Sequence, residues 1–369
     1  MTKQRKISLI IQRSLNMANF VVYKNKIKNN IEKLKRAFTA KNLDFQIFYS
    51  VKTNSCSPVL TAVKESGSEF EILSNFEWEK VKGFNPKTLV LNGPGKQTEL
   101  AKNILEEVDT LYFNIDNDTD FGTLAKINPK LLDRLKVGLR VYLNADGVWN
   151  RFGYDVSDKD LWKIVKKIDL IKKLSGFHFH FSTNNFKISN YRLLLSQIKD
   201  FCDSFKIELE FLDIGGGLPA ANEFVYDFEI YRKLPSLISE LFPKLKIISE
   251  AGRNIVADTV NLEAKVISLK KTGENKFQVN IDTNIMHFQC FFEKKFWVEY
   301  KAKSKNNKQP TEIEICGNSC MQIDKISESI MIEQNPEVGD EVIIHNIGAY
   351  SHSQAADFIT TIPEVKTYE

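Results

Sequence analysis

Apolar runs and amphipathic stretches alternate along the chain from about residue 25 to residue 254. The amphipathic stretches, such as KIKNNIEKLKRAF and YRLLLSQIKDFCDSF, have the three- and four-residue spacing of helices. Repeated alternation of strand and helix predicts a parallel sheet with helical crossovers. We expect eight strands, at residues 45–50, 69–74, 88–93, 110–115, 135–141, 174–180, 209–215 and 245–250. Eight such units close into an α/β fold of the (β/α)8 TIM barrel type, and an open doubly wound sheet is the alternative.

The pattern changes after residue 254 to short apolar runs separated by turn residues. Runs such as KFQVNIDT and EVIIHNI predict a second, all-β domain of barrel or sandwich type. The basic N-terminal segment ends in NFVVYK, which is expected to add a strand to this domain; ISLII is too short for a signal sequence. The expected organisation is an N-terminal segment at 1–24, a barrel at 25–254 and a β domain at 255–369.

Composition and charge exclude several classes of function. The 369 residues carry 51 Lys and Arg against 47 Asp and Glu, which are mixed along the chain, so no nucleic-acid groove is expected. No apolar run approaches the ~18 residues that span a bilayer, so no membrane association is expected. Five scattered cysteines form no disulfide framework, and we expect a reducing, cytoplasmic environment.

Reactive side chains in barrels of this type lie at the C-terminal ends of the strands. The expected strand ends carry Lys52, Glu71, Asn92, Arg140, His178, His180, Gly215 to Gly217, Glu250 and Arg253. Packing alone does not predict a lysine, a glutamate, a histidine pair and two glycine turns in these places. These residues are therefore the candidate site.

Two glycine-containing turns follow the last expected strands. DIGGGLP spans residues 213–219, and SEAGRNIV contains Gly252 and Arg253. Glycines let the backbone approach a bound group, and successive N–H groups bind anions. With a guanidinium beside them the two turns indicate a phosphate site, whereas a three-glycine turn alone is more often only a tight turn.

The histidine pair in GFHFHF is open to several interpretations. His178 and His180 lie on one face of the expected strand, because side chains alternate with period two. A metal site needs a third ligand with fitting spacing, and the sequence offers none, so no metal is expected. An imidazole can instead stack on an aromatic ligand, and two ordinary core histidines are the equal alternative.

Seven motifs in order resemble a known family. They are FYSVKTN, FEILS, GFHFHFSTN, DIGGGLP, SEAGR, CGNSCMQID and IGAYSHS. The sequence resembles the pyridoxal-phosphate enzymes with the alanine-racemase-like barrel (fold type III), in the branch of the ornithine, diaminopimelate and arginine decarboxylases. Each motif is modest, but seven with compatible spacing over nearly the whole chain are highly specific. The resemblance implies an amino-acid decarboxylase that requires pyridoxal 5'-phosphate.

The resemblance assigns roles to the matching barrel residues. It implies that Lys52 holds the cofactor as a Schiff base, that His180 stacks on its ring and that Glu250 pairs with the ring nitrogen. The residues implied around the phosphate are Thr183, Gly216, Gly217, Gly252, Arg253 and Tyr350. Glu71 and Arg140 are further candidate cofactor contacts, because they stand at strand ends.

The β domain supplies the remaining candidates by the same resemblance. Cys320 acts as a proton donor in the active site of a second subunit, which implies a homodimer with shared active sites. Asp324 marks the same interface region, Glu293 lies near the family's specificity segment, and both are candidate substrate-binding residues together with Met321. Met321 replaces the acid that contacts the distal amine of ornithine-like substrates, and a methionine cannot neutralise a buried ammonium. We therefore predict that free ornithine and lysine are not preferred, and that the substrate has an apolar far end or belongs to a larger conjugate.

Glu250 also bears on the type of reaction. A carboxylate favours a protonated ring nitrogen and hence a strong electron sink, whereas racemases of this fold usually carry an arginine there. Glu250 therefore favours decarboxylation over racemisation, which remains the first alternative. A regulatory protein that has lost the cofactor and a metal-dependent barrel hydrolase are more remote alternatives.

Overall fold

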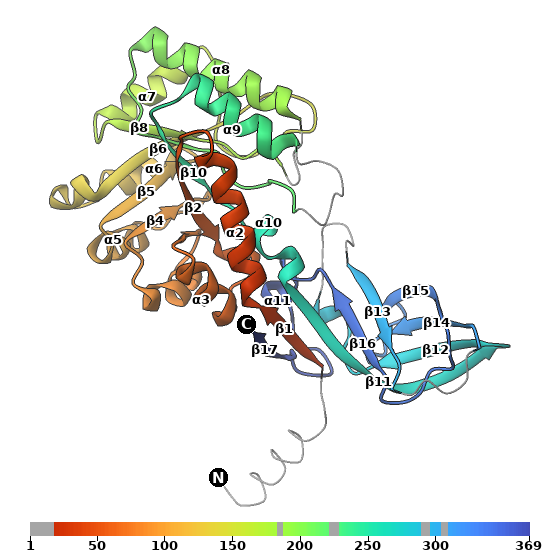
Figure 1. Cartoon of the computed structure of the whole chain (residues 1–369). Helices are drawn as coiled ribbons and strands as arrows, with labels where there is room; N and C mark the ends of the chain where they lie inside the picture. The colour runs from red at the N-terminus through yellow and green to blue at the C-terminus, as the bar shows by residue number, and fades with distance from the viewer. Residues whose placement is uncertain (1–17, 183–186, 221–228, 289–295, 304–308) are drawn as a thin grey trace, which may run out of the picture. The chain divides into compact units, whose positions relative to one another are not determined.

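The structure is a computed structural model that describes residues 18–182, 187–220, 229–288, 296–303 and 309–369 (Figure 1). The chain divides into two compact units. One unit, the barrel unit, runs from Asn25 to Val256. The other, the β unit, combines the residues up to Lys24 with Ala257–Glu369. In the described part of the chain, no helix combines the length and the apolar character needed to cross a bilayer.

The barrel unit is a closed ring of eight parallel strands. In spatial order they are β5 (Thr110–Ile115), β4 (Thr88–Leu91), β3 (Glu69–Ile72), β2 (Asp44–Ser50), β10 (Lys246–Ser249), β9 (Phe211–Asp213), β8 (Leu174–His178) and β6 (Leu135–Tyr142). Strand β6 pairs back with β5 and closes the ring, and the two-residue strand β7 (Tyr154–Asp155) lies beside β6. The predicted (β/α)8 barrel and its eight strands are therefore confirmed.

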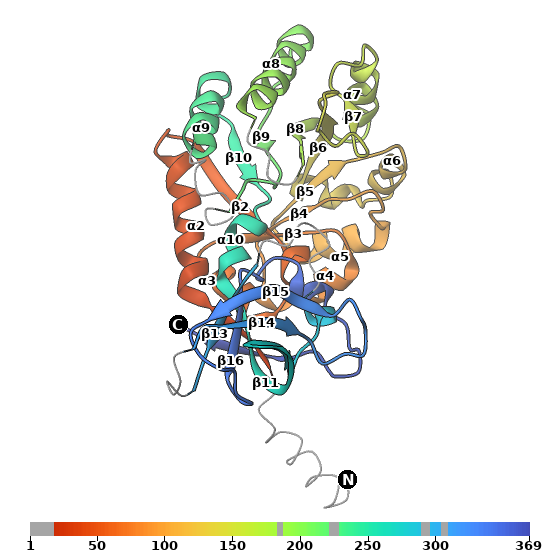
Figure 2. The same ribbon diagram turned by 90° about the vertical axis from the view of Figure 1, so that its right-hand side faces the viewer.

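Helices cover the outside of these strands (Figure 2). They are α2 (Lys24–Thr39), α3 (Ser57–Glu65), α4 (Asn75–Val81), α5 (Thr98–Glu107), α6 (Thr119–Leu124), α7 (Leu161–Asp169), α8 (Ile188–Phe205), α9 (Glu229–Leu241) and α10 (Arg253–Val256). Short 3-10 turns lie at η1 (Val51–Thr53), η2 (Lys82–Phe84) and η3 (Pro129–Arg134). Amphipathic helices pack an apolar face against the sheet, as α2 illustrates. Helix α2 buries Ile27, Ile31 and Phe38 on one face, and the Phe38 ring stacks on Phe45 of β2 with centroids 4.0 Å apart.

Apolar side chains from five strands meet in one buried cluster of the barrel unit. The cluster contains Phe48, Val90, Tyr112, Phe211 and Ile248. Tyr112 packs edge-on against both other rings, with centroids 5.5 Å from Phe48 and 5.0 Å from Phe211. This packing fixes the strands, so that the polar residues at their C-terminal ends are carried on a rigid support.

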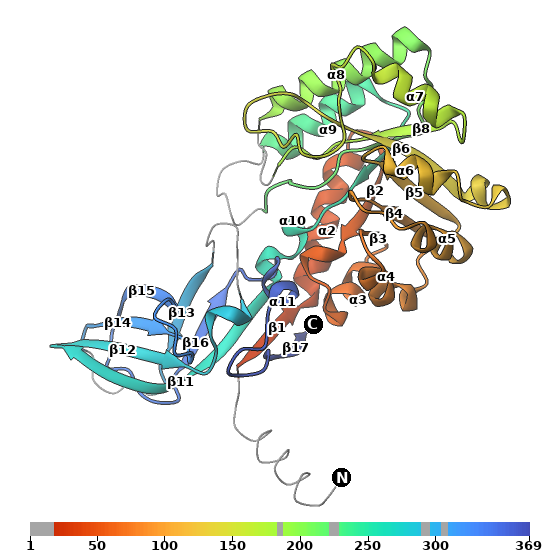
Figure 3. The ribbon, with the colours of Figure 1, turned by 180° about the vertical axis from the view of Figure 1, so that it is seen from behind.

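The β unit contains one eight-stranded, mostly antiparallel sheet. Its path is β13 (Trp297–Lys301), β16 (Glu341–His345), β11 (Val260–Gly273), β12 (Lys276–Ile281), β14 (Thr311–Cys316) and β15 (Lys325–Ile332). The N-terminal strand β1 (Asn19–Tyr23) pairs antiparallel with β11 and parallel with β17 (Glu364–Tyr368) (Figure 3). Short helical turns are η4 (Ala257–Thr259), η5 (Ile285–His287) and α11 (Ser351–Gln354). The predicted all-β domain with an N-terminal strand is confirmed.

Candidate active site

Lys52 lies in η1, immediately after strand β2 ends at Ser50. Its Nζ is 2.9 Å and 3.2 Å from the two carboxylate oxygens of Glu71, at the end of the neighbouring strand β3. Ser50 Oγ donates to Glu71 Oε2 at 2.6 Å. The Glu71 side chain is fully buried, whereas the Lys52 side chain is 44% exposed. The amine is therefore held by a fixed carboxylate while it remains accessible.

Burial raises the pKa of Glu71 to about 7, although the Lys52 ammonium opposes the rise. The nearby Glu250 carboxylate raises this pKa further. A carboxyl group that titrates near neutral pH and touches an amine can exchange a proton with it.

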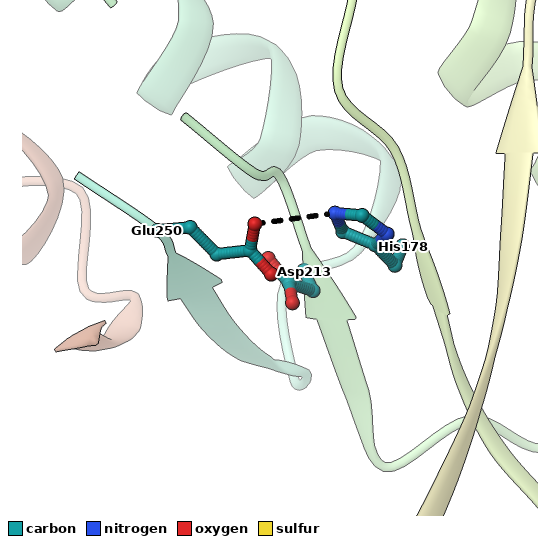
Figure 4. A group of neighbouring side chains, drawn as sticks. All are labelled: His178, Asp213 and Glu250. Carbon is teal, nitrogen blue, oxygen red and sulfur yellow. Dashed lines mark ion pairs between the residues drawn. The ribbon is translucent and has the colours of Figure 1, made fainter. Parts of the chain in front are cut away.

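Glu250 directly follows β10, the neighbour of β2 in the ring. Asn92, at the end of β4, donates its amide N–H to Glu250 Oε1, and His178 Nε2 lies 3.4 Å from Glu250 Oε2 (Figure 4). Asp213 ends β9 beside them, and one polar atom from each of His178, Asp213 and Glu250 lies within 4.8 Å of the others. All of these side chains are buried. Burial alone would raise the pKa of Glu250, but His178 and Asp213 hold that pKa well below its usual value.

The sequence offered no third ligand for a metal beside the histidine pair, yet the fold brings two carboxyl groups to His178. The oxygens of these carboxyl groups are bound by N–H donors: Asn92 donates to Glu250, and Asn114 and Gly215 each donate to Asp213 at 2.9 Å. These hydrogen bonds direct the oxygen lone pairs toward protein N–H groups. The cluster is therefore organised to hold and orient carboxyl groups.

His180 lies two residues beyond the end of β8, in contact with the glycine turn. Its Nδ1 accepts a hydrogen bond from the Gly216 N–H at 3.1 Å, so a neutral ring carries its proton on Nε2. Burial lowers the pKa of His180 to about 3, and the Arg140 guanidinium lowers it further, so the imidazole is neutral at pH 7. The indole of Trp149 stacks on the imidazole with centroids 5.5 Å apart and planes at 25°.

Arg140 and the glycine turns complete the barrel candidates. The Arg140 guanidinium pairs with Asp116 at 3.3 Å, one strand away. Gly215 and Gly217 have φ values of +64° and +81°, and a Cβ at either would collide with a backbone carbonyl. The chain's own packing therefore requires these two glycines, with or without a bound phosphate. A Cβ on Gly252 would collide with Thr53, next to Lys52.

The β-unit candidates lie mainly in the loop between β14 and β15. Cys320 is exposed there, and Met321 follows it on the wall of a pocket of about 390 Å³. The buried Asp324 carboxylate accepts backbone N–H bonds from Ile285 and Ser319, each at 2.9 Å. Asp324 thus shapes the loop that carries Cys320, and its predicted contact with substrate remains a prediction.

The structure sorts the predicted site residues into two groups. The barrel unit brings together Lys52, Glu71, Arg140, His180, Gly216, Gly217, Glu250, Gly252 and Arg253, the last of which begins α10. The β unit holds Cys320, Met321, Asp324 and Tyr350. Thr183 and Glu293 lie outside the described residues.

The family model described as "Pyridoxal-dependent decarboxylase, pyridoxal binding domain" matches residues 24–257, which is more than half of the chain. The chain belongs to the pyridoxal-dependent decarboxylases. It is thus a carboxy-lyase that uses pyridoxal phosphate and acts on an amino acid.

Similarity to individual decarboxylases extends over nearly the whole chain. The lysine/ornithine decarboxylase of Selenomonas ruminantium is 24% identical, over 93% of this chain and 92% of that protein. A diaminopimelate decarboxylase of Helicobacter pylori is 25% identical, over 90% of this chain and 85% of that protein. The solved structure of the arginine decarboxylase of Paramecium bursaria Chlorella virus covers 100% of both chains with a TM-score of 0.80. At 16% identity, this last likeness concerns the fold alone.

The barrel residues of this pyridoxal-dependent decarboxylase fit its cofactor chemically. The accessible Lys52 amine suits an aldehyde, and the ionised, buried Glu250 suits a protonated ring nitrogen. His180 offers a neutral aromatic ring. The donor types are those that the cofactor's aldehyde, ring nitrogen and ring face require.

Two residues of the decarboxylase site escaped the sequence analysis. Asp213 stands at a strand end in DIGGGLP, so the rule that found Glu250 could have found it as well. Trp149 lies in the segment between β6 and β7, where no periodic pattern marks it. Its position follows only from the fold, in which the backbone N–H of Trp149 donates to the carbonyl of Phe181 at 2.7 Å.

Proposed function

We propose that this chain removes the α-carboxylate of an amino acid, free or part of a larger conjugate, as carbon dioxide. One observation carries the proposal. The accessible Lys52 amine, after β2, contacts Glu71 on the neighbouring strand β3, and the ionised Glu250 follows β10, the neighbour of β2 on its other side. The bound cofactor supplies an electron sink for the carbanion that carbon dioxide leaves behind. The remaining tasks of binding, orientation and proton transfer fall to the chain's own side chains.

Lys52 and Glu71 act as an amine and its proton acceptor. Glu71 is placed to exchange a proton with Lys52 Nζ, since burial raises the pKa of this carboxyl to about 7 and the two groups are 2.9 Å apart. The neutral form of this amine would be the group that holds the cofactor through its aldehyde. Ser50 fixes Glu71 Oε2 through its hydroxyl, so that the carboxylate stays within reach of the amine.

Glu250 and His180 act on the cofactor ring. The Glu250 carboxylate would hold a proton on the ring nitrogen, because an anion favours the charged form of a neighbouring base. His180 would stack on the ring as a neutral imidazole, which adds no positive charge to oppose that proton. Trp149 packs on the same imidazole and, with the Gly216 N–H, limits its rotation.

The phosphate contacts proposed in the barrel are Gly217, Gly252 and Arg253. Gly216 contributes indirectly, since its N–H is bonded to His180. Thr183 and Tyr350 are proposed as further contacts by their match to the family's motifs. Arg140 is proposed to act through charge, because its guanidinium lowers the pKa of His180.

Carbon dioxide release tests the proposal against racemisation. The purified protein, supplied with pyridoxal phosphate, is incubated with amino acids and with peptide, carrier-protein and nucleotide conjugates of them. We expect a product lighter by carbon dioxide, detected by mass spectrometry. Inversion of the α-carbon with no loss of mass would instead support the racemase alternative.

The far end of the substrate is predicted to be apolar, or to belong to a larger conjugate, because Met321 stands where the family carries an acid. The variant Met321→Asp is expected to raise kcat/KM for ornithine by roughly 10- to 100-fold, since a hydrogen bond to a charged group contributes about 1.5–3 kcal/mol. Steady-state assays with ornithine and lysine measure this gain, and Met321→Leu serves as the apolar control. Efficient turnover of ornithine by the unaltered protein, with no gain in Met321→Asp, would contradict the prediction.

Cys320 is proposed to protonate the substrate carbon in the active site of the partner subunit of a homodimer. Its exposure on the loop between β14 and β15 is compatible with a thiol that serves another chain. Cys320→Ala is expected to lower turnover by about 10²–10⁴-fold, the usual contribution of a positioned proton donor.

Mixing the inactive variants Lys52→Ala and Cys320→Ala tests whether Cys320 acts in trans. Random pairing makes half of the dimers mixed, and each mixed dimer has one site with both residues intact, so about one quarter of full activity should return. Each variant assayed alone is the control. Activity that stays at the level of the parent variants would show that Cys320 serves its own chain or has no catalytic role.

A further inference from the structure

Two buried carboxyl groups face each other at the ends of adjacent strands. Asp213 ends β9 and Glu250 follows β10, and their side chains are 0% and 6% exposed. Two anions this close in a low-dielectric interior repel each other strongly. The pair therefore needs either a cation or a shared proton.

The nearby cations are already bound to other acids. The Lys52 ammonium lies on Glu71 at 2.9 Å, and the Arg140 guanidinium pairs with Asp116 at 3.3 Å. His178 Nε2 is 3.4 Å from Glu250 Oε2, which is long for a charge-assisted hydrogen bond, and burial lowers the pKa of His178. The titratable groups coupled to the pair are His178 on β8, His180 after β8, Lys52 after β2, Glu71 on β3 and Tyr112 on β5. A proton is thus the remaining means of relieving the repulsion.

Surrounding contacts decide which acid carries this proton. Glu250 accepts a hydrogen bond from Asn92 and is stabilised as an anion by the Lys52 ammonium, and its Oε2 lies 3.4 Å from His178 Nε2. Asp213 has Asn114 and Gly215 as neutral donors, and its carboxyl group lies beside that of Glu250. An O–H on Asp213 would therefore point at Glu250, which is the better anion of the two.

We propose that Asp213 is a neutral carboxylic acid at neutral pH, and that its O–H donates to Glu250 and holds that carboxylate ionised and in place. Asp213 is thus a positioning residue for Glu250. The protonation state of Asp213 is a property of the protein without its cofactor. A failure of this inference would therefore leave the proposed decarboxylation unaffected.

A neutral Asp213 makes stability depend on pH in a known direction. Burial beside Glu250 raises the pKa of Asp213 well above its usual value, so the folded state binds a proton that the unfolded state releases. The contribution of Asp213 to the free energy of unfolding is therefore fully present below its pKa in the unfolded chain, about 3.9. It declines as the pH rises toward its pKa in the folded protein. An asparagine at position 213 keeps an N–H donor for Glu250 but has no carboxyl proton to release on unfolding.

The variant Asp213→Asn tests the inference through urea unfolding of the full chain with its cofactor removed. Between about pH 5 and pH 8, the unfolding constant of the unaltered protein relative to that of the variant should rise by up to about tenfold per pH unit, because unfolding releases one proton. A flat ratio, or a ratio that falls with pH, would overturn the inference. A flat ratio is also the result expected if the proton resides on His178.

Asp340→Asn is the matched control. Asp340 is as buried as Asp213, but its carboxylate accepts hydrogen bonds from the Tyr300 hydroxyl and from the backbone N–H groups of Lys303 and Glu337. Loss of these hydrogen bonds should lower stability across the range without the tenfold slope.

Infrared spectroscopy covers the case in which Asp213→Asn fails to fold. The unaltered protein, labelled with ¹³C in its aspartate carboxyl groups, should show at neutral pH an isotope-shifted carbonyl band of a protonated carboxylic acid. Glu250→Gln removes the anion that repels Asp213, so the band should weaken in that variant. Absence of a protonated aspartate band in the labelled protein would overturn the inference.

Discussion

Replacing Lys52 by alanine is expected to lower turnover by about 10³-fold or more and to abolish stable attachment of pyridoxal phosphate. The substitution removes both the nucleophile that attaches the cofactor and the proton exchange with Glu71, and positioned proton transfer alone contributes about 10²–10⁴-fold. Steady-state carbon dioxide release measures the loss, and the visible absorbance of the protein reports the attached cofactor.

Lys64→Ala is the matched control for this prediction. Lys64 pairs with Glu69 at 2.7 Å, at the opposite end of the same strand β3 that ends near Glu71. The variant loses a similar lysine–glutamate pair away from the strand ends that carry the site, so it should keep its activity and its colour. A Lys52→Ala protein that turns over substrate as fast as Lys64→Ala would exclude Lys52 from the reaction.

Replacing Glu250 by glutamine is expected to lower kcat by about 10²–10³-fold, the usual cost of losing one preorganised electrostatic contact. A neutral amide does not favour a protonated ring nitrogen, so the electron sink becomes weaker. Glutamine also loses charge-assisted interactions, because Asn92, His178 and Asp213 all interact with the carboxylate of Glu250. Steady-state kinetics and the pH dependence of the cofactor's absorbance measure the effect.

Glu77→Gln controls for general damage by the Glu250 substitution. Glu77 is another glutamate of the barrel unit that is 6% exposed, and it accepts hydrogen bonds from the Leu73 N–H and the Ser74 hydroxyl. Its charge is a smaller cause of the raised pKa of Glu71 than burial and Glu250, so its substitution should change kcat by no more than a few-fold. If Glu250→Gln kept kcat within a few-fold of Glu77→Gln, the proposed role of Glu250 would be wrong.

The barrel could be predicted well from the sequence because its signal is local. Each strand is a short apolar run next to an amphipathic stretch, and the eight runs coincide with β2 to β6 and β8 to β10. Strand β15 (Lys325–Ile332) was missed because it lies at the edge of its sheet, and its sequence KISESIMI leaves most side chains exposed or half-buried. Strand β17 was missed for the same reason, since EVKTY buries no side chain fully.

The candidate site could be predicted only as far as strand ends reveal it. Lys52, Glu71 and Glu250 follow from their places after apolar runs, and the barrel rule then places them on one rim. Contacts between side chains do not follow from that rule. The bond from Gly216 to His180 and the stacking of Trp149 on the same ring depend on where two segments meet in space. The protonation of Asp213 depends on its distance from Glu250, which only the closed ring determines.

Covalent attachment of the cofactor to one amine is the claim on which the proposed reaction depends. The protein is loaded with pyridoxal phosphate, reduced with borohydride and digested, and the modified peptide is located by mass spectrometry. We predict a stable adduct on the peptide that contains Lys52, and none on that peptide in Lys52→Ala. An adduct on a different lysine, or no adduct in the fully loaded protein, would contradict the proposed role of Lys52.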